Sequence, residues 1–163
     1  MKKQIVDNIV RLLDENVNGL YVVGSYRRGE EIINDLDFVT KRDLNDVLRD
    51  INRIMNFDTL VIGPDYARIR VYYTHQYSIS VDIWKANNMY EYKFLKWMRT
   101  MDKEHNIGYR LMAKKKGLLL SDRGLYDKEI DHYYTFDTLE NLDRKSTRLN
   151  SSHTDISRMP SSA

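Results

Sequence analysis

The chain of 163 residues contains no cysteine, which excludes disulfide bonds, thiolate zinc sites and thiol nucleophiles. Its four histidines are too far apart in sequence to indicate a metal cluster, so any metal ion should be held by oxygen ligands. The first 16 residues contain no unbroken apolar run, which predicts neither a signal peptide nor a membrane span. We therefore expect a soluble intracellular protein without a membrane partner.

Length and charge indicate one main folded unit with a basic extension. A chain that is 42% hydrophobic and 163 residues long can form one well-cored domain with a smaller satellite, and we expect a monomer. Residues 1–82 contain 11 Lys and Arg against 13 Asp and Glu, a net of −2, whereas residues 93–123 contain 9 against 3, a net of +6. This asymmetry suits cation binding in the first part and phosphate binding in the second, although a solvated basic helix face is the alternative.

Hydrophobic periodicity predicts an α+β protein with a mixed sheet. Apolar residues at helical spacing predict a first helix that ends before Gly19, and Asp43 is the expected N-cap of a later helix. The other expected elements of the first part are a strand at 20–24, one short helix over 25–33, a strand at 35–40 and three strands joined by hairpin turns at 57–63, 66–73 and 77–84.

A change of pattern near residue 90 predicts a second subdomain. Longer helical stretches begin at Met89, and residues 118–127 form a plausible β-hairpin. Residues 144–163 turn abruptly to Ser, Thr, Asn and Arg, which predicts disorder, and this segment resembles translated library adapter. We therefore expect units at 1–90 and 91–143, the second one truncated, followed by a non-native tail.

Three aspartates are candidates for a metal site. Asp35 and Asp37 are two residues apart, so a strand directs both carboxylates to one face, where they repel each other unless a cation lies between them. Asp82 alternates with Ile79, Val81 and Ile83 and should lie on the face opposite these apolar side chains. A neighbouring strand could bring the three together as the ligands of two Mg²⁺ ions, although each alone is more often a solvated carboxylate.

The segment "GSYRRG", residues 24–29, lies between an expected strand and an expected helix. Backbone N–H groups at a helix start attract anions, and Gly24 permits close approach of the backbone. Ser25 offers a hydroxyl, and Arg27 or Arg28 offers a bidentate fork for phosphate. Taken separately, a Gly-Ser turn is common in loops, and paired arginines usually face solvent.

Together these residues resemble a known family. The stretch "GSYRRGEEIINDLDFV" is similar to the "GSxRRGxExxxDxD" signature of the X-family DNA polymerases, the polymerase beta-like branch of the nucleotidyltransferase superfamily. Residues 106–127 are similar to part of the family's thumb, and the resemblance covers nearly all of residues 5–127. It implies a nucleotidyltransferase palm, with a mixed and largely antiparallel sheet flanked by helices, followed by a small helical and β-hairpin thumb.

The resemblance also implies roles for individual residues. Asp35 and Asp37 would ligate both Mg²⁺ ions, for which Mn²⁺ can substitute, and Asp82 would join them and help to deprotonate the primer 3′-hydroxyl. Ser25 and Arg28 would hold the nucleotide phosphates. The residues implied to assist nucleotide binding or to contact DNA are Gly24, Asn34, Asn106, Lys114, Lys115 and Lys116.

The chain departs from the family pattern at two places. Residues 98–102, "MRTMD", replace a "YFTGS"-like turn that packs on the nucleotide sugar, so sugar selection is not implied. No counterpart of the family's amino-terminal lyase domain is expected, so gap-directed repair with lyase trimming is not implied either.

The expected function is DNA-directed transfer of a deoxynucleoside monophosphate from a dNTP to a primer 3′-hydroxyl, with release of pyrophosphate. The partners would be primer, template DNA and dNTP. Transfer to tRNA or to protein hydroxyls is an alternative that would use the same site. A catalytically weak, palm-like nucleic-acid-binding fragment is the non-enzymatic alternative.

Overall fold

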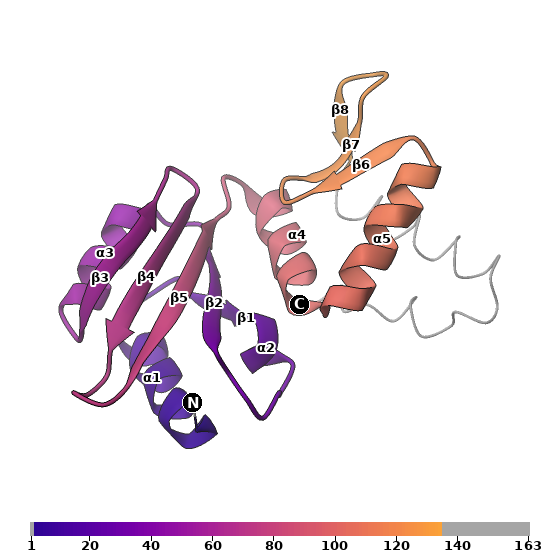
Figure 1. Cartoon of the computed structure of the whole chain (residues 1–163). Coiled ribbons are helices and arrows are strands. Elements are labelled where there is room, and N and C mark those ends of the chain that lie inside the picture. Colours follow the sequence, from indigo (N-terminus) through magenta and orange to yellow (C-terminus); the bar gives the residue numbers. More distant parts are fainter. Residues whose placement is uncertain (1, 135–163) are drawn as a thin grey trace. The chain divides into compact units, whose positions relative to one another are not determined.

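The computed structural model describes residues 2–134, and the chain divides into two compact units, Met1–Tyr92 and Lys93–Ala163. The elements that begin in the first unit are α1 (Lys3–Asn16), β1 (Tyr21–Val23), α2 (Gly24–Arg27), β2 (Asp35–Thr40), α3 (Leu44–Asn52), β3 (Asn56–Ile62), β4 (Tyr66–Tyr72), β5 (Ser78–Lys85) and α4 (Met89–Thr100). The second unit continues with α5 (Lys103–Lys115), β6 (Leu118–Ser121), β7 (Gly124–Asp127) and β8 (His132–Tyr134). The structure is thus α+β, as expected (Figure 1).

The first unit is built on a five-stranded sheet in the order β1-β2-β5-β4-β3. Strand β2 pairs antiparallel with β1 and parallel with β5, whereas β5–β4 and β4–β3 are antiparallel hairpin pairs. The expected mixed, largely antiparallel sheet and the two hairpins are therefore confirmed. The parallel β2–β5 pair is the feature that matters for the site, because it pairs residues that are 45 positions apart in sequence, such as Asp37 and Asp82.

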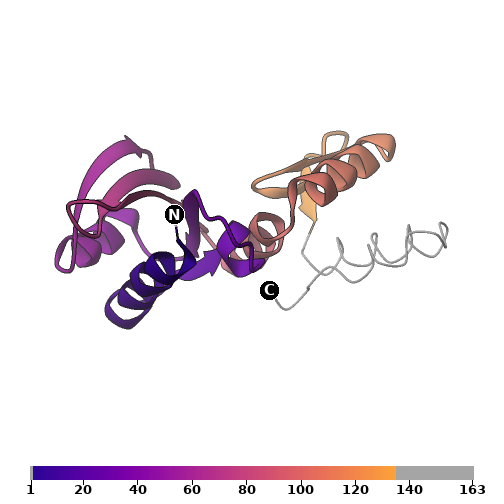
Figure 2. The same ribbon diagram turned by 60° about the horizontal axis from the view of Figure 1, so that its bottom comes forward.

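Helices α1 and α3 pack on one face of this sheet, as Figure 2 shows. Their buried faces meet alternate residues of the strands in one apolar core, which includes Ile9, Leu13, Val47, Ile51, Leu36, Phe38, Ile69, Val81 and Ile83. Asp43 caps α3 as predicted, since its carboxylate accepts a hydrogen bond of 2.8 Å from the Asn45 N–H. Because strand side chains alternate, the residues between the apolar ones are directed to the opposite face.

Helix α2 is shorter than the helix expected over residues 25–33, and the expectation of that length was wrong. It ends after a single turn because Gly29 adopts a φ of 78° in the left-handed region. The Glu30 N–H then bonds to the Ser25 carbonyl and the Gly29 N–H to the Tyr26 carbonyl, each at 3.1 Å, which is the Schellman arrangement of a helix end. Residues 30–34 leave the turn as a loop that leads into β2.

The second unit packs α4 and α5 with the three-stranded sheet β6-β7-β8. Its apolar core consists of Phe94, Trp97, Met98, Met101, Tyr109, Ala113, Leu120 and Leu125. The predicted hairpin over residues 118–127 is confirmed by the antiparallel pairing of β6 with β7, and β8 is an addition that the sequence did not predict.

Residues 135–143 of the expected second unit, and the predicted disordered tail at 144–163, lie outside the described residues. Within residues 2–134, every helix is too short or too polar to cross a membrane.

Candidate active site

The three aspartates singled out in the sequence lie on two adjacent strands and on one face of the sheet. In the parallel pairing of β2 with β5, Asp37 is directly opposite Asp82, and Asp35 is opposite Ser80. Leu36, between the two aspartates of β2, belongs to the core beneath α1 and α3, so all three carboxylates are on the other face. Since neighbouring strands are only about 4.8 Å apart, this register concentrates three negative charges in a small area.

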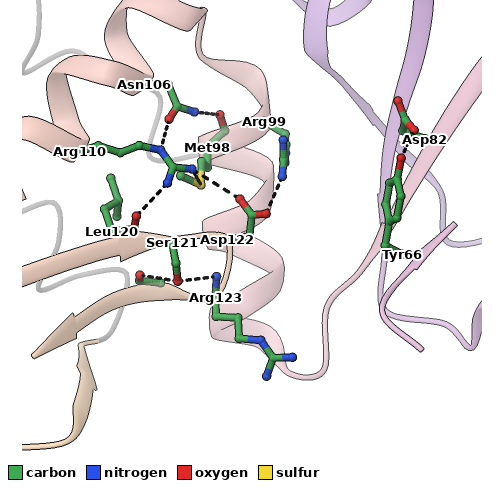
Figure 3. A network of polar contacts seen from close by, with 11 residues as sticks. Tyr66, Asp82, Met98, Arg99, Asn106, Arg110, Leu120, Ser121, Asp122 and Arg123 are labelled. Atoms are coloured by element: carbon green, nitrogen blue, oxygen red, sulfur yellow. Dashed lines mark hydrogen bonds and ion pairs between the residues drawn. The ribbon is translucent and has the colours of Figure 1, made fainter. Parts of the chain in front are cut away.

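An arginine and a tyrosine of β4 hold two of these carboxylates, those of Asp82 and Asp35. Arg68 is opposite Asp82 in the β4–β5 pairing, and its Nη1 donates to Asp82 Oδ1 at 3.2 Å and Oδ2 at 3.1 Å. Its Nη2 donates to Asp35 Oδ1 at 3.3 Å, so one guanidinium bridges two strands. The Tyr66 hydroxyl also donates to Asp82 Oδ1 (Figure 3). These contacts leave Asp82 only 6% exposed.

The environment keeps both β4 groups in their hydrogen-bond-donating forms. Burial, followed by the hydrogen bond to Asp82 and the charge of that residue, raises the pKa of the Tyr66 hydroxyl. The negative charge of Asp82 raises the pKa of Arg68. Tyr66 therefore stays neutral and Arg68 stays charged at physiological pH, and Asp82 keeps both partners.

Gly24 brings the Gly-Ser turn against the carboxylates. The residue is buried and adopts a φ of 73°, where a side chain is strained. A Cβ at this position would lie 2.2 Å from Asp37 Oδ2 and 3.0 Å from Asp37 Cγ. Only glycine allows the backbone at the end of β1 to approach Asp37 so closely, which explains why a glycine precedes Ser25 here.

The other residues of this segment differ in their contacts and in their exposure to solvent. Arg27 is used within the fold: its Nε donates to the Val22 carbonyl at 3.0 Å, and its guanidinium lies 4.4 Å from the centre of the Tyr21 ring. Arg28 is at the surface in an ion pair of 2.7 Å with Glu30. Ser25 is half-buried beside Gly24, and Asn34 is exposed just before β2. Arg27 is therefore held by backbone and ring atoms of β1, whereas Arg28 forms an ion pair with an acidic side chain of the turn itself.

Tyr26 fastens the same turn to α1, because its hydroxyl donates to Asp7 Oδ1 at 2.6 Å. Burial, then the hydrogen bond to Asp7, raises the pKa of Tyr26 from its ordinary 10.0 to about 12. A raised pKa means that the folded state favours the protonated form. The stability that this bond contributes is thus complete below pH 10 and is lost as the pH rises towards 12.

We expect Tyr26→Phe to lower the free energy of unfolding by about 1 kcal/mol at pH 8, which urea denaturation would measure. The difference from the unmodified chain should shrink as the pH rises from 10 to about 12. Tyr90, which is 60% exposed, provides the control variant Tyr90→Phe, with no comparable loss. A difference that stays constant across this pH range would contradict the assignment.

The donor set suits a hard divalent cation. Asp35, Asp37 and Asp82 offer carboxylate oxygens, the ligands that Mg²⁺ prefers. The backbone at Gly24 lies close to the Asp37 side chain. As they stand, however, no three His, Cys, Asp or Glu side chains within residues 2–134 are arranged to hold a metal ion. The Arg68 guanidinium lies between Asp35 and Asp82 instead.

The second unit carries the remaining candidate residues. Asn106, on α5, has its amide within a local network: its Oδ1 accepts from Arg110 Nε at 2.7 Å, and its Nδ2 donates to the Met98 carbonyl at 3.5 Å (Figure 3). Arg110 also donates to the Leu120 carbonyl at 3.0 Å. Asn106 therefore ties α5 to α4, and contact with a nucleotide base would require these bonds to be exchanged.

Two charge features complete this unit. Asp122 pairs with Arg99 at 2.8 Å and with Arg110 at 3.6 Å. Two of the arginines of the second unit are thus in ion pairs within that unit. Lys114, Lys115 and Lys116 are exposed at the end of α5, where they also complement the helix dipole.

Sequence reasoning missed Tyr66 and Arg68. The signal was present in the stretch "YARIRVYY", where Tyr66, Arg68 and Arg70 alternate with buried Ala67 and Ile69. Polar side chains at every second position of a strand share one face, and the predicted hairpin places this strand beside β5, but the sequence does not say that β2 lies on the other side of β5.

Comparison with known proteins adds no family assignment: no protein-family model matches the chain, and no curated protein matches it either.

Proposed function

We propose that the first unit is a nucleotidyltransferase palm and that the protein transfers a nucleoside monophosphate from a dNTP to the 3′-hydroxyl of a DNA primer, with release of pyrophosphate. The observation that carries the proposal is the register of β2 and β5, in which Asp37 is opposite Asp82 and Asp35 is on the same face. This register brings Asp82 beside the last residue of the motif 24–37, from which it is 45 positions away in sequence.

Each carboxylate has a defined task in this proposal. Asp35 and Asp37 would hold the divalent ions, and Asp82 would complete the site and accept the proton of the attacking hydroxyl. Bound Mg²⁺ would neutralise phosphate charge and make the 3′-hydroxyl more acidic. Tyr66 orients Asp82, because its hydroxyl donates to Oδ1 of that carboxylate. The group that would take the proton is thereby held by a hydrogen bond from β4.

Ser25 and Arg28 would bind the phosphates of the nucleotide. The Ser25 hydroxyl is next to the Gly24 turn, and Arg28 follows at the end of α2. Phosphate would take the place of Glu30 in the ion pair with Arg28, whose two side chains are 29% and 49% exposed, and exposed pairs contribute about 1 kcal/mol or less. A doubly charged phosphate group is the stronger partner. In this proposal the exposed Lys114–Lys116 run contacts primer or template phosphates.

Primer extension tests the proposal. The full chain is incubated with a labelled primer, dNTPs and Mg²⁺ or Mn²⁺, on templated, gapped and single-stranded substrates. We expect extension by single nucleotides with release of pyrophosphate, and none when divalent ions are chelated. Parallel reactions with NTPs would measure sugar preference.

Other outcomes would favour the alternatives. Transfer of labelled nucleotide to tRNA or to protein, without primer extension, would assign the same site to another acceptor. Salt-dependent DNA binding without incorporation on any substrate would indicate a nucleic-acid-binding module.

A further inference from the structure

Arg68 occupies the position that a cation would take between two of the carboxylates. Its Nη1 is 3.2 and 3.1 Å from the two oxygens of Asp82, and its Nη2 is 3.3 Å from Asp35 Oδ1. These are the oxygens that would face an ion held between Asp35 and Asp82. A guanidinium and a divalent ion cannot share them, because both are positive and both need the same lone pairs.

The contact follows from the sheet and from the type of side chain. Strand β4 lies on the far side of β5 from β2, and Arg68 is opposite Asp82 in the pairing. Its side chain must therefore cross β5 to reach Asp35 on β2, a span that the long arginine stem and planar fork allow. The side chains of Arg68 and Asp82 are 35% and 8% exposed, so the pair is screened less than a surface pair.

Arg70 shows that this arrangement is specific to position 68. It is two residues further along β4 and on the same face, yet its guanidinium donates to the hydroxyls of Ser78 at 3.3 Å and Ser80 at 3.0 Å. The two arginines carry the same charge and lie on the same face of β4. The contacts with Asp35 and Asp82 are made by Arg68, whereas Arg70 contacts serine hydroxyls.

We propose that Arg68 is an internal counter-cation that competes with a divalent metal ion for Asp35 and Asp82. Without metal it balances part of the carboxylate repulsion and keeps the side chains in place. When metal binds, the guanidinium withdraws, so Arg68 raises the metal concentration that the site needs. This inference rests on the proposed function in that the three carboxylates take a divalent ion.

Binding of Mn²⁺ to the full chain tests the proposal without a catalytic assay, since electron paramagnetic resonance measures free Mn²⁺ directly. We expect Arg68→Gln to lower the Kd about tenfold, a change that corresponds to 1.4 kcal/mol. The matched control Arg70→Gln removes the same charge nearby and should change the Kd by less than about twofold. Arg68→Lys, which keeps the charge but not the fork, should lie between the unmodified chain and Arg68→Gln.

The unmodified chain supplies a second measurement that does not depend on the folding of a variant. In a Mg²⁺ titration followed by NMR, the Arg68 side-chain Nε–H resonance should shift with the same midpoint as metal binding. The resonance of Arg42, which pairs with Asp50 at 2.9 Å, should not move.

The outcomes separate this inference from the proposed function. Suppose that Asp82→Asn binds Mn²⁺ more weakly than the unmodified chain, and that Arg68→Gln binds it equally well or more weakly. The counter-cation role is then overturned, while the metal site stands. If the unmodified chain, Arg68→Gln and Asp82→Asn all fail to bind Mn²⁺ at millimolar concentration, both ideas are overturned. Tighter binding by Arg68→Gln alone among the arginine-to-glutamine variants supports the inference.

Discussion

The Asp82→Asn variant is expected to lose nucleotide incorporation by about 10³-fold or more while it keeps its fold and its affinity for DNA. The substitution preserves the shape of the side chain and an oxygen that can accept from Tyr66, but it removes the negative charge. Asp82 is 6% exposed and contacts Arg68 and Tyr66 on β4, so this charge lies at the centre of the candidate site. The measurements are the rate of primer extension and the anisotropy of labelled DNA.

The sheet offers a matched control for this variant. Asp58 on β3 accepts a hydrogen bond of 2.6 Å from the Tyr72 hydroxyl, which is the same kind of tyrosine–carboxylate pair. Strand β3, however, lies at the edge of the sheet next to β4 and is not a neighbour of β2 or β5. Asp58→Asn should therefore retain incorporation within a few-fold of the unmodified chain. If Asp82→Asn retained a tenth or more of the activity, and if both variants had the same melting temperature, Asp82 would have no catalytic role.

The Gly24→Ala variant is expected to be the most destabilising substitution in the turn. An alanine at a φ of 73° costs about 1–2 kcal/mol in backbone strain. Its Cβ would also lie 2.2, 3.0 and 3.1 Å from the Oδ2, Cγ and Cβ atoms of Asp37, and such overlap costs about 1–3 kcal/mol more. The two shortest contacts are with Oδ2 and Cγ, so relief requires Asp37 to leave its present rotamer, and its Cβ would still lie 3.1 Å away. Asp37 must move, and incorporation should be lost as well.

Gly29→Ala separates the strain from the collision. Gly29 has a similar φ of 78°, and no atom of the described residues lies within 4 Å of a Cβ at that position, so this variant should show the strain alone. The two variants should differ in melting temperature by about 10 °C, given 4–8 °C per kcal/mol for a domain of this size. Equal losses would show that the approach of Gly24 to Asp37 is not tight. A double-mutant cycle with Asp37→Ala should recover part of the Gly24→Ala loss, because it removes two of the colliding atoms.

Local patterns were sufficient for most of the secondary structure. The helix that begins at Asp43 and the hairpins of β3–β4, β4–β5 and β6–β7 were all predicted, because capping, helical spacing and alternation act over a few residues. The error at residues 25–33 has a local cause too. Gly29 could be recognised as a helix end, but its left-handed conformation and the Schellman bonds became visible only in the structure.

The candidate site was predicted in part. Alternation in β2 and β5 correctly predicted that Asp35 and Asp37 share a face and that Asp82 is directed away from Val81 and Ile83. The register of the two strands could not be predicted, since a shift by one residue would have placed Asp82 opposite a core position of β2. Arg68 went unnoticed because its contact with Asp35 depends on β2 lying on the far side of β5 from β4, which the predicted hairpin does not specify.

Composition and short-range spacing were enough to predict an α+β chain that places acidic side chains on strand faces. They also marked Gly24 as the residue of a close approach. Only the folded sheet decided that Asp37 faces Asp82 and that the Arg68 guanidinium lies between Asp82 and Asp35. The physical reason is that strand pairing joins residues 45 positions apart (37 and 82) through a core formed by the whole unit, and no local rule contains that information.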